Sequence, residues 1–273
     1  MVLWRHARRL VAVLVAALLM TPVLVVADFA ASPATAVATA ATTRNMNAAA
    51  VGGLLAPAGS PFIVDTFGRT LASGWGSADT GGAWSGSTGS LSVGGGAGFI
   101  KVAGAGSAPS VFLPATTSSD ADLSVTVSAD KVGTGNGVYL YTVGRRVSGA
   151  GDYRLQTRLR ADGLVGVSVL RTNAAGAQSV ISSEVTVPGY TFVAGGRLEV
   201  RFQVTGTSPT TLQAKVWPAT GIEPGTWLRS VTDSTPGLQV AGSVGFVAYL
   251  SGSGTNAPIT TSFDDLYVRP TTP

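Results

Sequence analysis

Beyond its first sixty residues the chain alternates apolar and polar side chains with a period of two. The segment 197–204 shows this clearly, because every second residue from Leu198 is apolar and the residues between are charged or amides. The same alternation runs through 122–130, 153–160 and 212–217. One apolar and one polar side at this period is typical of antiparallel strands that bury a single face. We therefore predict strands at these four positions.

Shorter runs rich in Val, Ile, Leu and Phe extend the strand pattern over the rest of the chain. These further strand candidates are 62–67, 91–93, 99–102, 111–113, 138–143, 164–170, 179–187, 244–250 and 259–268. Asp162-Gly163 and the segment 206–209 supply tight-turn residues between neighbouring runs. After residue 40, no window of ten or more residues carries a helical apolar stripe. The pattern predicts an all-β domain of two antiparallel sheets, a sandwich or a barrel.

The first forty residues have the composition of a secretory signal peptide. Arginines at 5, 8 and 9 precede an apolar run over 10–27, and small residues at 36–40 offer cleavage sites, of which we favour the one after Ala40. An uncleaved membrane anchor is the alternative, but Pro22 and the Ala-rich exit favour cleavage. Residues 41–60, rich in Ala and Gly, are interpreted as a flexible linker. We therefore expect a secreted, extracellular domain at 61–270 with no stable membrane insertion after cleavage.

Charge and residue usage narrow the chemistry of that domain. Cleavage after Ala40 removes three Arg and one Asp, so the net charge falls from +4 to +2 and gives no argument for a nucleic-acid partner. The chain has no Cys, and its one histidine, His6, lies in the leader. A Ser-His-Asp triad, a Cys-His pair, an imidazole zinc site and a disulfide framework are therefore excluded in the exported domain.

Three groups of residues resemble one known superfamily. They are 65–69 (DTFGR) with 74–84 (GWGSADTGGAW), then Gly137-Val138-Tyr139 with Arg145-Arg146 and Asp152-Tyr153-Arg154, and finally 242–246 (GSVGF) with 262–268 (SFDDLYV). Over roughly 62–269 the chain resembles concanavalin A-like/laminin-G-like jelly-roll modules of secreted actinobacterial proteins. The resemblance implies a two-sheet antiparallel jelly-roll β-sandwich, preceded by a signal peptide and a short linker. It leaves function open, because this superfamily includes lectins, glycanases, lyases and adhesion modules.

Two enzymatic groups of the superfamily have motifs that can be compared with this chain. Laminarinase-like hydrolases carry two catalytic carboxylates in an E-x-D-x-x-E strand, and none of Glu184, Glu199 and Glu223 lies in such a pattern. The segment 197–201 (RLEVR) resembles the R-x-E-x-R strand of jelly-roll alginate lyases, whose arginines neutralise a uronate. The Q-x-H strand and Tyr-x-Lys segment of those enzymes have no match here. Alternating charges also arise on ordinary exposed strands.

Polar residues on the outward sides of several strands motivate a binding surface. Amides, guanidinium groups and an indole on one face are groups that recognise sugars. The ligand-binding candidates are Tyr139, Arg158, Glu199, Arg201, Gln203, Gln213, Lys215 and Trp217. For Trp217 the alternative is packing beneath the loop at 218–224.

A metal site is a further expectation. In the topology that the resemblance implies, the first and last strands lie side by side, which would bring Asp65 near Asp264 and Asp265. Such oxygen ligands suit a structural calcium ion. The alternative is that one Asp of the pair caps a turn and the other is solvated.

We therefore predict a secreted, non-catalytic carbohydrate-binding or cell-surface interaction module, whose partner is a polysaccharide or cell-surface glycan. One alternative is a polysaccharide lyase or glycosidase of the jelly-roll class. Another is a purely structural or adhesive domain. The outer face discriminates among them: a groove with Glu199 between two arginines favours an enzyme, an exposed Trp217 favours binding, and a face covered by its own loops favours a structural role.

Overall fold

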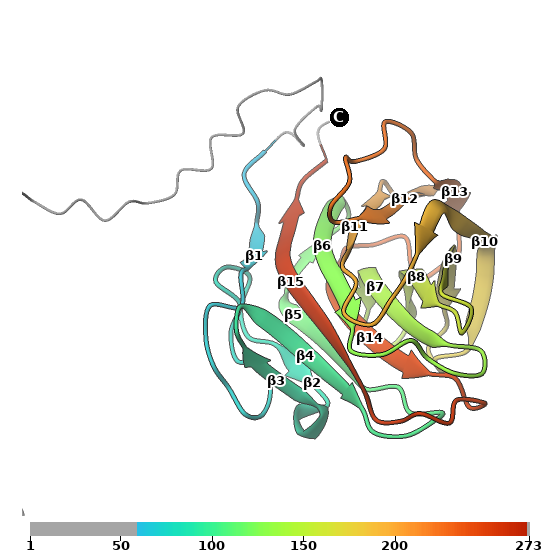
Figure 1. Cartoon of the computed structure of the whole chain (residues 1–273). Coiled ribbons are helices and arrows are strands. Elements are labelled where there is room, and N and C mark those ends of the chain that lie inside the picture. Colours follow the sequence, from blue (N-terminus) through green and yellow to red (C-terminus); the bar gives the residue numbers. More distant parts are fainter. Residues whose placement is uncertain (1–58, 272–273) are drawn as a thin grey trace, which may run out of the picture. The chain divides into compact units, whose positions relative to one another are not determined.

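The computed structural model describes residues 59–271. These residues form two antiparallel sheets packed face to face, which confirms the predicted jelly-roll β-sandwich of the concanavalin A-like class (Figure 1). The one helical element within this range is a 3-10 helix, Thr88–Ser90, and none of the described residues form a helix long and apolar enough to cross a membrane. The predicted signal peptide at 1–40, and all but the last two residues of the predicted linker at 41–60, lie outside the described residues.

Antiparallel pairing links all strands within each sheet. The first sheet has eight strands in the order β13-β12-β11-β6-β15-β4-β3, with β1 paired to β15. They are β1 (Ile63–Asp65), β3 (Leu91–Gly94), β4 (Ala97–Val102), β6 (Ala121–Ala129), β11 (Leu198–Thr205), β12 (Thr210–Pro218), β13 (Arg229–Asp233) and β15 (Ile259–Arg269). The second sheet has seven strands in the order β10-β9-β8-β7-β14-β5-β2. They are β2 (Ser85–Gly86), β5 (Ser110–Ser118), β7 (Val138–Val147), β8 (Gly151–Leu159), β9 (Leu164–Thr172), β10 (Gln178–Thr191) and β14 (Gly242–Leu250).

Every predicted strand overlaps an observed one, and the predicted turns lie where the chain reverses. The Asp162-Gly163 turn joins β8 to β9, with Gly163 at a positive φ of 80° and the Asp162 carboxylate accepting the Leu164 N–H at 3.0 Å. Segment 206–209 joins β11 to β12. Two short strands, β2 and β13, were not predicted, because neither has a run of alternating apolar residues long enough to recognise.

The core lies between the sheets, and Trp75 and Trp84 pack within it. The inward positions are mostly Val, Leu, Ile and Phe. Trp75 and Trp84 meet edge to face at 5.0 Å between ring centroids, and Trp75 also packs on Phe246 and Phe263. Both indoles are buried.

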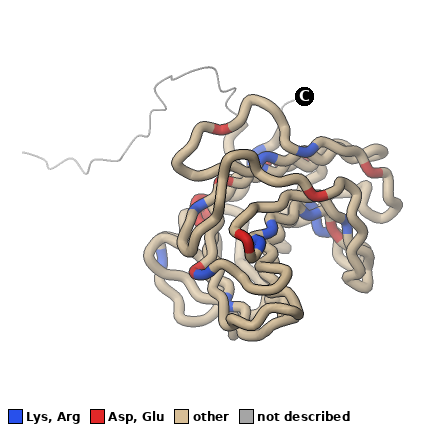
Figure 2. Tube along the Cα trace, turned by 45° about the vertical axis from the view of Figure 1, so that its right-hand side comes forward, with Lys and Arg blue, Asp and Glu red and all other residues tan. Residues whose placement is uncertain are grey.

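The residues that point away from the core form two separate surfaces. We call the outer surface of the seven-stranded sheet the front face, and that of the eight-stranded sheet the back face. Lys and Arg lie beside Asp and Glu at several places, and long stretches of the trace carry neither (Figure 2). The charged groups are therefore local clusters, and each face has its own.

Candidate functional site

The residues predicted to form one binding surface lie on both faces. On the back face, pairing of β11 with β12 places six of the predicted residues opposite one another in three cross-strand pairs. These are Glu199 with Trp217, Arg201 with Lys215, and Gln203 with Gln213. Tyr139 and Arg158 are paired on β7 and β8 of the other sheet, so they belong to the front face. The sequence pattern gave the outward direction of each residue, but it did not reveal which strands are neighbours.

On the back face the charged side chains neutralise one another beneath a loop. Arg201 donates to Asp122 at 2.6 and 2.9 Å and to Glu223 at 2.8 Å, and Lys215 also donates to Glu223 at 2.8 Å. Glu223 and Trp227 belong to the loop after β12, and the indole ring covers the Lys215 Nζ at 4.7 Å and the Arg201 Cζ at 5.4 Å. These contacts make this part of the back face an internal ionic network.

Glu199 is likewise engaged within the back face. Its carboxylate accepts the Thr126 hydroxyl at 2.8 Å. Burial raises the pKa of Glu199, and the Thr126 hydrogen bond and the charge of Arg197 only partly oppose this. Trp217, opposite it, is half-buried. The R-x-E-x-R segment therefore forms ordinary cross-strand contacts and no groove with Glu199 held between two arginines.

Two of the three predicted metal ligands, Asp65 and Asp264, are bound by other protein groups. The fully buried Asp65 accepts hydrogen bonds from Arg69 at 2.7 and 2.8 Å, from the Trp84 indole at 2.7 Å and from the Phe67 N–H at 2.9 Å. Asp264 forms an ion pair with Arg197 at 2.9 Å. Between residues 59 and 271 no group of three or more His, Cys, Asp and Glu side chains could hold a metal ion. Calcium at Asp65, Asp264 and Asp265 stays a prediction.

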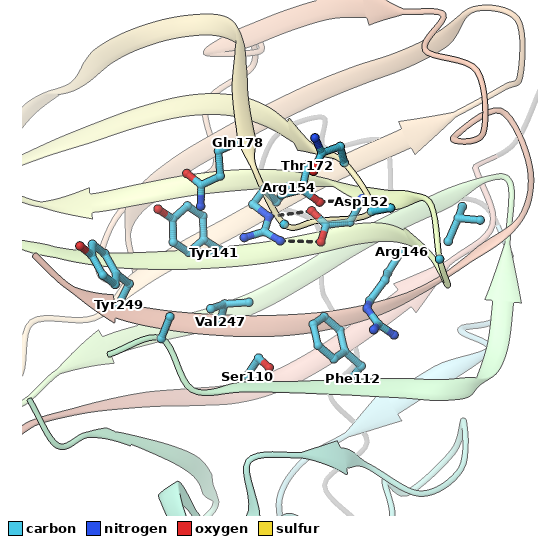
Figure 3. A pocket seen from close by; sticks show the side chains of 17 residues that line it. Ser110, Phe112, Tyr141, Arg146, Asp152, Arg154, Thr172, Gln178, Val247 and Tyr249 are labelled. Carbon is cyan, nitrogen blue, oxygen red and sulfur yellow. Dashed lines mark hydrogen bonds and ion pairs between the residues drawn. The ribbon is translucent and has the colours of Figure 1, made fainter. Parts of the chain in front are cut away.

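The front face contains a cleft of about 590 Å³ that crosses six strands (Figure 3). Its lining combines aromatic rings with charged groups. The lining residues used below are Phe112 on β5, Tyr141 and Arg146 on β7, Asp152 and Arg154 on β8, and Tyr249 on β14. Tyr141 also belongs to a small apolar cluster with Val143 and Val247, which gives this sheet a second packed surface outside the main core.

An arginine and a tyrosine are fixed side by side in the cleft. Arg154 donates to both carboxylate oxygens of Asp152, at 2.6 and 2.5 Å, and its Cζ lies 5.2 Å from the centre of the Tyr141 ring. Burial raises the pKa of Tyr141, although Gln178 and Arg154 act in the opposite direction. Gln178 reaches toward the Tyr141 hydroxyl from β10 (Figure 3). The cleft thus presents a neutral phenol beside an oriented guanidinium group.

Further along the same face lies a second cluster, which we call the Arg158 group: Tyr139, Gln156, Arg158 and Glu184. The Arg158 guanidinium lies 3.5 Å from the Glu184 carboxylate, and its Cζ lies 5.3 Å from the centre of the Tyr139 ring. Gln156 donates to Ser168 at 3.0 Å and to Glu184 at 3.5 Å. Burial raises the pKa of Tyr139, with Arg158 opposing and Glu184 adding to the rise. Arg158 and Glu184 remain partly exposed to solvent.

Gly166 on β9 leaves the space that the Glu184 side chain occupies. Glu184 extends from β10 over Gly166 to reach Arg158 on β8, and a Cβ atom at Gly166 would lie 2.4 Å from the Glu184 Cδ. Irregular pairing of β10 with β9 between Ser182 and Val185 accompanies this arrangement. A carboxylate from one strand can therefore meet an arginine two strands away.

Sequence reasoning missed most of these front-face residues, although signals for some were present. Arg154, Gln156 and Arg158 alternate on the polar side of 153–160, and Tyr141 shares a side with Tyr139. Glu184 had no such signal, because its contact with Arg158 depends on pairing across β9.

Comparisons with known proteins agree with the fold. No family model matches the chain, and no curated protein matches it either. A complex of alginate lyase Aly36B with an alginate trisaccharide is similar, at a TM-score of 0.51 and 10% identity, over 77% of this chain and 98% of that one. An endo-acting O-glycanase structure from the human gut microbiota has a TM-score of 0.52 and 13% identity, over 78% and 100% of the two chains. A β-1,3-glucanase from Mycobacterium marinum has a TM-score of 0.49 and 14% identity, over 77% and 99%.

These neighbours correct the predicted function. Aly36B and the O-glycanases are enzymes, so the prediction of a non-catalytic binding module is wrong and its alternative, a polysaccharide lyase or glycosidase, is favoured. At 10–13% identity the likeness itself establishes a common fold. What the comparisons identify for this chain is a jelly-roll sandwich fold.

Proposed function

We propose that this protein is a polysaccharide lyase, which cleaves a uronate-containing polysaccharide by β-elimination on its front face. The observation that carries the proposal is the Arg158 group, in which one guanidinium group lies beside both a phenol and a carboxylate. β-Elimination at a uronate needs a cation for the sugar carboxylate, an acceptor for the C5 proton and a donor for the leaving oxygen. Arg158, Glu184 and Tyr139 supply these three functions.

Each side chain suits its role. Arg158 matches a carboxylate in shape and charge, and its Nε donates to the Asn136 carbonyl at 2.8 Å, which fixes the plane of the guanidinium group. Tyr139 keeps its proton at neutral pH, as a free phenol does, and burial raises its pKa further, so it can donate. Glu184 is the nearby carboxylate that can accept a proton.

The reaction balances without a further reactant. Glu184 takes the C5 proton, the C5–H electron pair forms the C4=C5 double bond, the C4–O4 bond breaks, and O4 receives the proton of Tyr139. Glu184 is then protonated and Tyr139 ionised, and proton exchange with solvent restores both. One product carries an unsaturated uronate at its new end, and no water is added.

A glycosidase mechanism fits this face less well. Glycosidases need two carboxyl groups about 5–10 Å apart. The carboxylate that lines the cleft, Asp152, precedes Arg158 on β8 by six residues, or about 20 Å at the rise of a strand. It is also bound by both oxygens to Arg154. Glu184 therefore lacks a catalytic carboxylate partner on the described front face.

The test is to incubate the purified protein with polymannuronate, polyguluronate, polygalacturonate and polyglucuronate and to follow the ultraviolet absorbance of unsaturated uronate. We expect absorbance to rise with at least one of them, and Tyr139→Phe to lower the rate by about 100- to 10,000-fold. Tyr267→Phe is the matched control, because Tyr267 also packs against an arginine, Arg269 at 5.2 Å, but on the other sheet. New reducing ends without ultraviolet absorbance would refute elimination.

Export is part of the same proposal, since a polysaccharide substrate lies outside the cell. It is supported by the signal-peptide composition of 1–40. N-terminal sequencing of the protein from culture supernatant should give a start between residues 28 and 48. An intact Met1 in a membrane fraction would contradict it.

A further inference from the structure

Arg146 differs from its neighbours on the front face because it has no carboxylate partner. Arg154 and Arg158 each form an ion pair, with Asp152 and Glu184. Arg146 lines the same cleft and is half-exposed, and among residues 59–271 it forms no ion pair and no side-chain hydrogen bond. Its Cζ lies 4.3 Å from the centre of the Phe112 ring, which holds the guanidinium group by a cation–π contact (Figure 3).

The local backbone explains why this side chain faces the cleft. The pairing of β7 with β8 shifts between Val143 and Arg145. This bulge turns Arg145 into the interior, where it is fully buried, and leaves Arg146 on the front face opposite Asp152. An arginine held on an aromatic ring, with its hydrogen-bond donors unused, is ready to bind an anion.

We propose that the cleft around Arg146 is a second carboxylate-binding subsite, so that the substrate carries uronate carboxylates on more than one of the sugar units that the front face holds. This rests on the proposed function for the identity of the polymer. Arg146 lies opposite Asp152, six residues before Arg158 on β8, so the two arginines are separated by about 20 Å along the strand. That span holds several consecutive sugar units. Arg154 lies between them, and its charge is paired with that of Asp152.

Tyrosines and a phenylalanine complete the surface between the two positions. Tyr139 stacks on Tyr141 at 6.3 Å and packs against Tyr249 at 5.6 Å. Rings of this kind cover the apolar sides of sugars. The occupant that fits is an extended polyuronate whose rings lie on the aromatic groups and whose carboxylates meet Arg158 and Arg146.

The test measures binding separately from cleavage. In a Tyr139→Phe background, in which turnover is strongly slowed, isothermal titration is carried out with a hexauronate, a diuronate and cellohexaose. We expect Arg146→Gln to weaken hexauronate binding by about tenfold, the size of one lost charged hydrogen-bonded contact. Arg146→Gln should not affect binding of the diuronate when the diuronate occupies only the Arg158 end. Cellohexaose, which has no carboxylates, should bind weakly with or without Arg146→Gln. Arg269→Gln is the matched control, because Arg269 also lies on an aromatic ring, that of Tyr267, but belongs to the eight-stranded sheet.

The outcomes separate this inference from the proposed function. If Arg146→Gln binds hexauronate as tightly as the background protein, or if hexauronate does not bind at all, the second subsite is refuted. If a sulfated hexasaccharide without carboxylates binds in an Arg146-dependent way and hexauronate does not, the carboxylate assignment is wrong. If hexauronate binding depends on Arg146 but the unaltered enzyme cleaves no polyuronate, the subsite stands and the lyase function fails. Circular dichroism on each variant verifies that the fold is retained.

Discussion

Burial acts on two ionisable side chains of this protein with different consequences. Burial raises the pKa of Tyr139 on the front face and of Glu199 on the back face. A proton held into the alkaline range is useful to a proton donor such as Tyr139. For Glu199 the same shift means that ionisation is less favourable in the folded state than in the unfolded chain. The first side chain therefore bears on activity and the second on stability.

The activity should persist to alkaline pH. Because Tyr139 loses its proton at a higher pH than a free phenol, we expect kcat/KM to hold until the pH passes the ordinary tyrosine pKa of about 10. The measurement is a pH profile of kcat/KM on the best polyuronate, corrected for any loss of folded protein. A decline centred below about pH 9 would show that a different group donates the proton.

Glu199→Gln should stabilise the protein at neutral and alkaline pH. The folded state holds the Glu199 proton to higher pH than the unfolded chain does, so the contribution of Glu199 to stability is present below its unfolded pKa and is lost as pH rises through its folded pKa. Glutamine keeps a polar group for Thr126 without a charge. We expect a higher Tm for the variant at pH 8 and little difference at pH 4. Asp122→Asn should lower the Tm at both, because Asp122 is the buried partner of Arg201. A Glu199→Gln protein that melts lower at pH 8 would contradict this reading.

At the scale of elements, irregular strand pairing places the front-face groups. The β10 irregularity and the bare surface of Gly166 let Glu184 cross β9. The bulge in β7 reverses the alternation, so that Arg145 points inward and Arg146 points to the front face. A regular strand would have kept residues 143 and 145 on one side. The first departure brings Glu184 to Arg158, and the second places Arg146 in the cleft.

Gly166→Ala should impair catalysis while the sandwich stays folded. The new methyl group would occupy the space of the Glu184 Cδ, so the carboxylate must move away from Arg158. We expect kcat to fall by about 100-fold, since small misplacements of a catalytic group are costly. Gly94→Ala is the matched control, because Gly94 also lies in a strand and a Cβ there meets nothing within 4 Å. Equal kcat for Gly166→Ala and the unaltered enzyme would remove Glu184 from the mechanism.

Arg145→Met should destabilise the fold far more than Arg146→Gln, its neighbour. The buried Arg145 guanidinium donates to the Thr210 hydroxyl at 2.7 Å and to the carbonyls of Leu238, Gly206 and Ser119. Removing it leaves several buried acceptors without a donor, which costs about 3 kcal/mol or more. Denaturant unfolding measures both variants. If Arg145→Met and Arg146→Gln had similar free energies of unfolding, Arg145 would not stabilise the fold through its contacts with Thr210, Leu238, Gly206 and Ser119.

The sequence predicted the strands and their outward sides well, because alternation is a local property. Leu198 and its alternating neighbours on β11 are buried as expected, and β1 pairs with β15 as the resemblance implied. The candidate site was predicted less well, because it depends on which strands meet. Arg158 and Arg201 look alike in sequence, yet one lies beside a phenol and a partly exposed Glu184, and the other beneath Trp227. Alternation of apolar and polar residues does not show which strands a loop covers or where a bulge interrupts a strand.

At the scale of the whole molecule, the outer faces of the two sheets differ. The back face is stabilised by its own ion pairs, and the front face carries the proposed activity. The inner surfaces share one core of aliphatic and aromatic side chains. On the back face the charged side chains pair with one another beneath the loop that contains Glu223 and Trp227. The front face keeps a cleft, partly exposed charges and aromatic rings across six strands. The sandwich therefore presents one face suited to an extended anionic polymer.

The central claim is that this face breaks a glycosidic bond by elimination and not by hydrolysis. The most direct measurement is mass spectrometry of the products formed from a polyuronate in water enriched with heavy oxygen. Elimination predicts a product pair whose summed mass equals that of the substrate, with an unsaturated unit at the new non-reducing end and no heavy oxygen incorporated during cleavage, once exchange at reducing ends is corrected with a product standard. Products heavier by one water, with heavy oxygen incorporated at the cleavage point, would contradict the account.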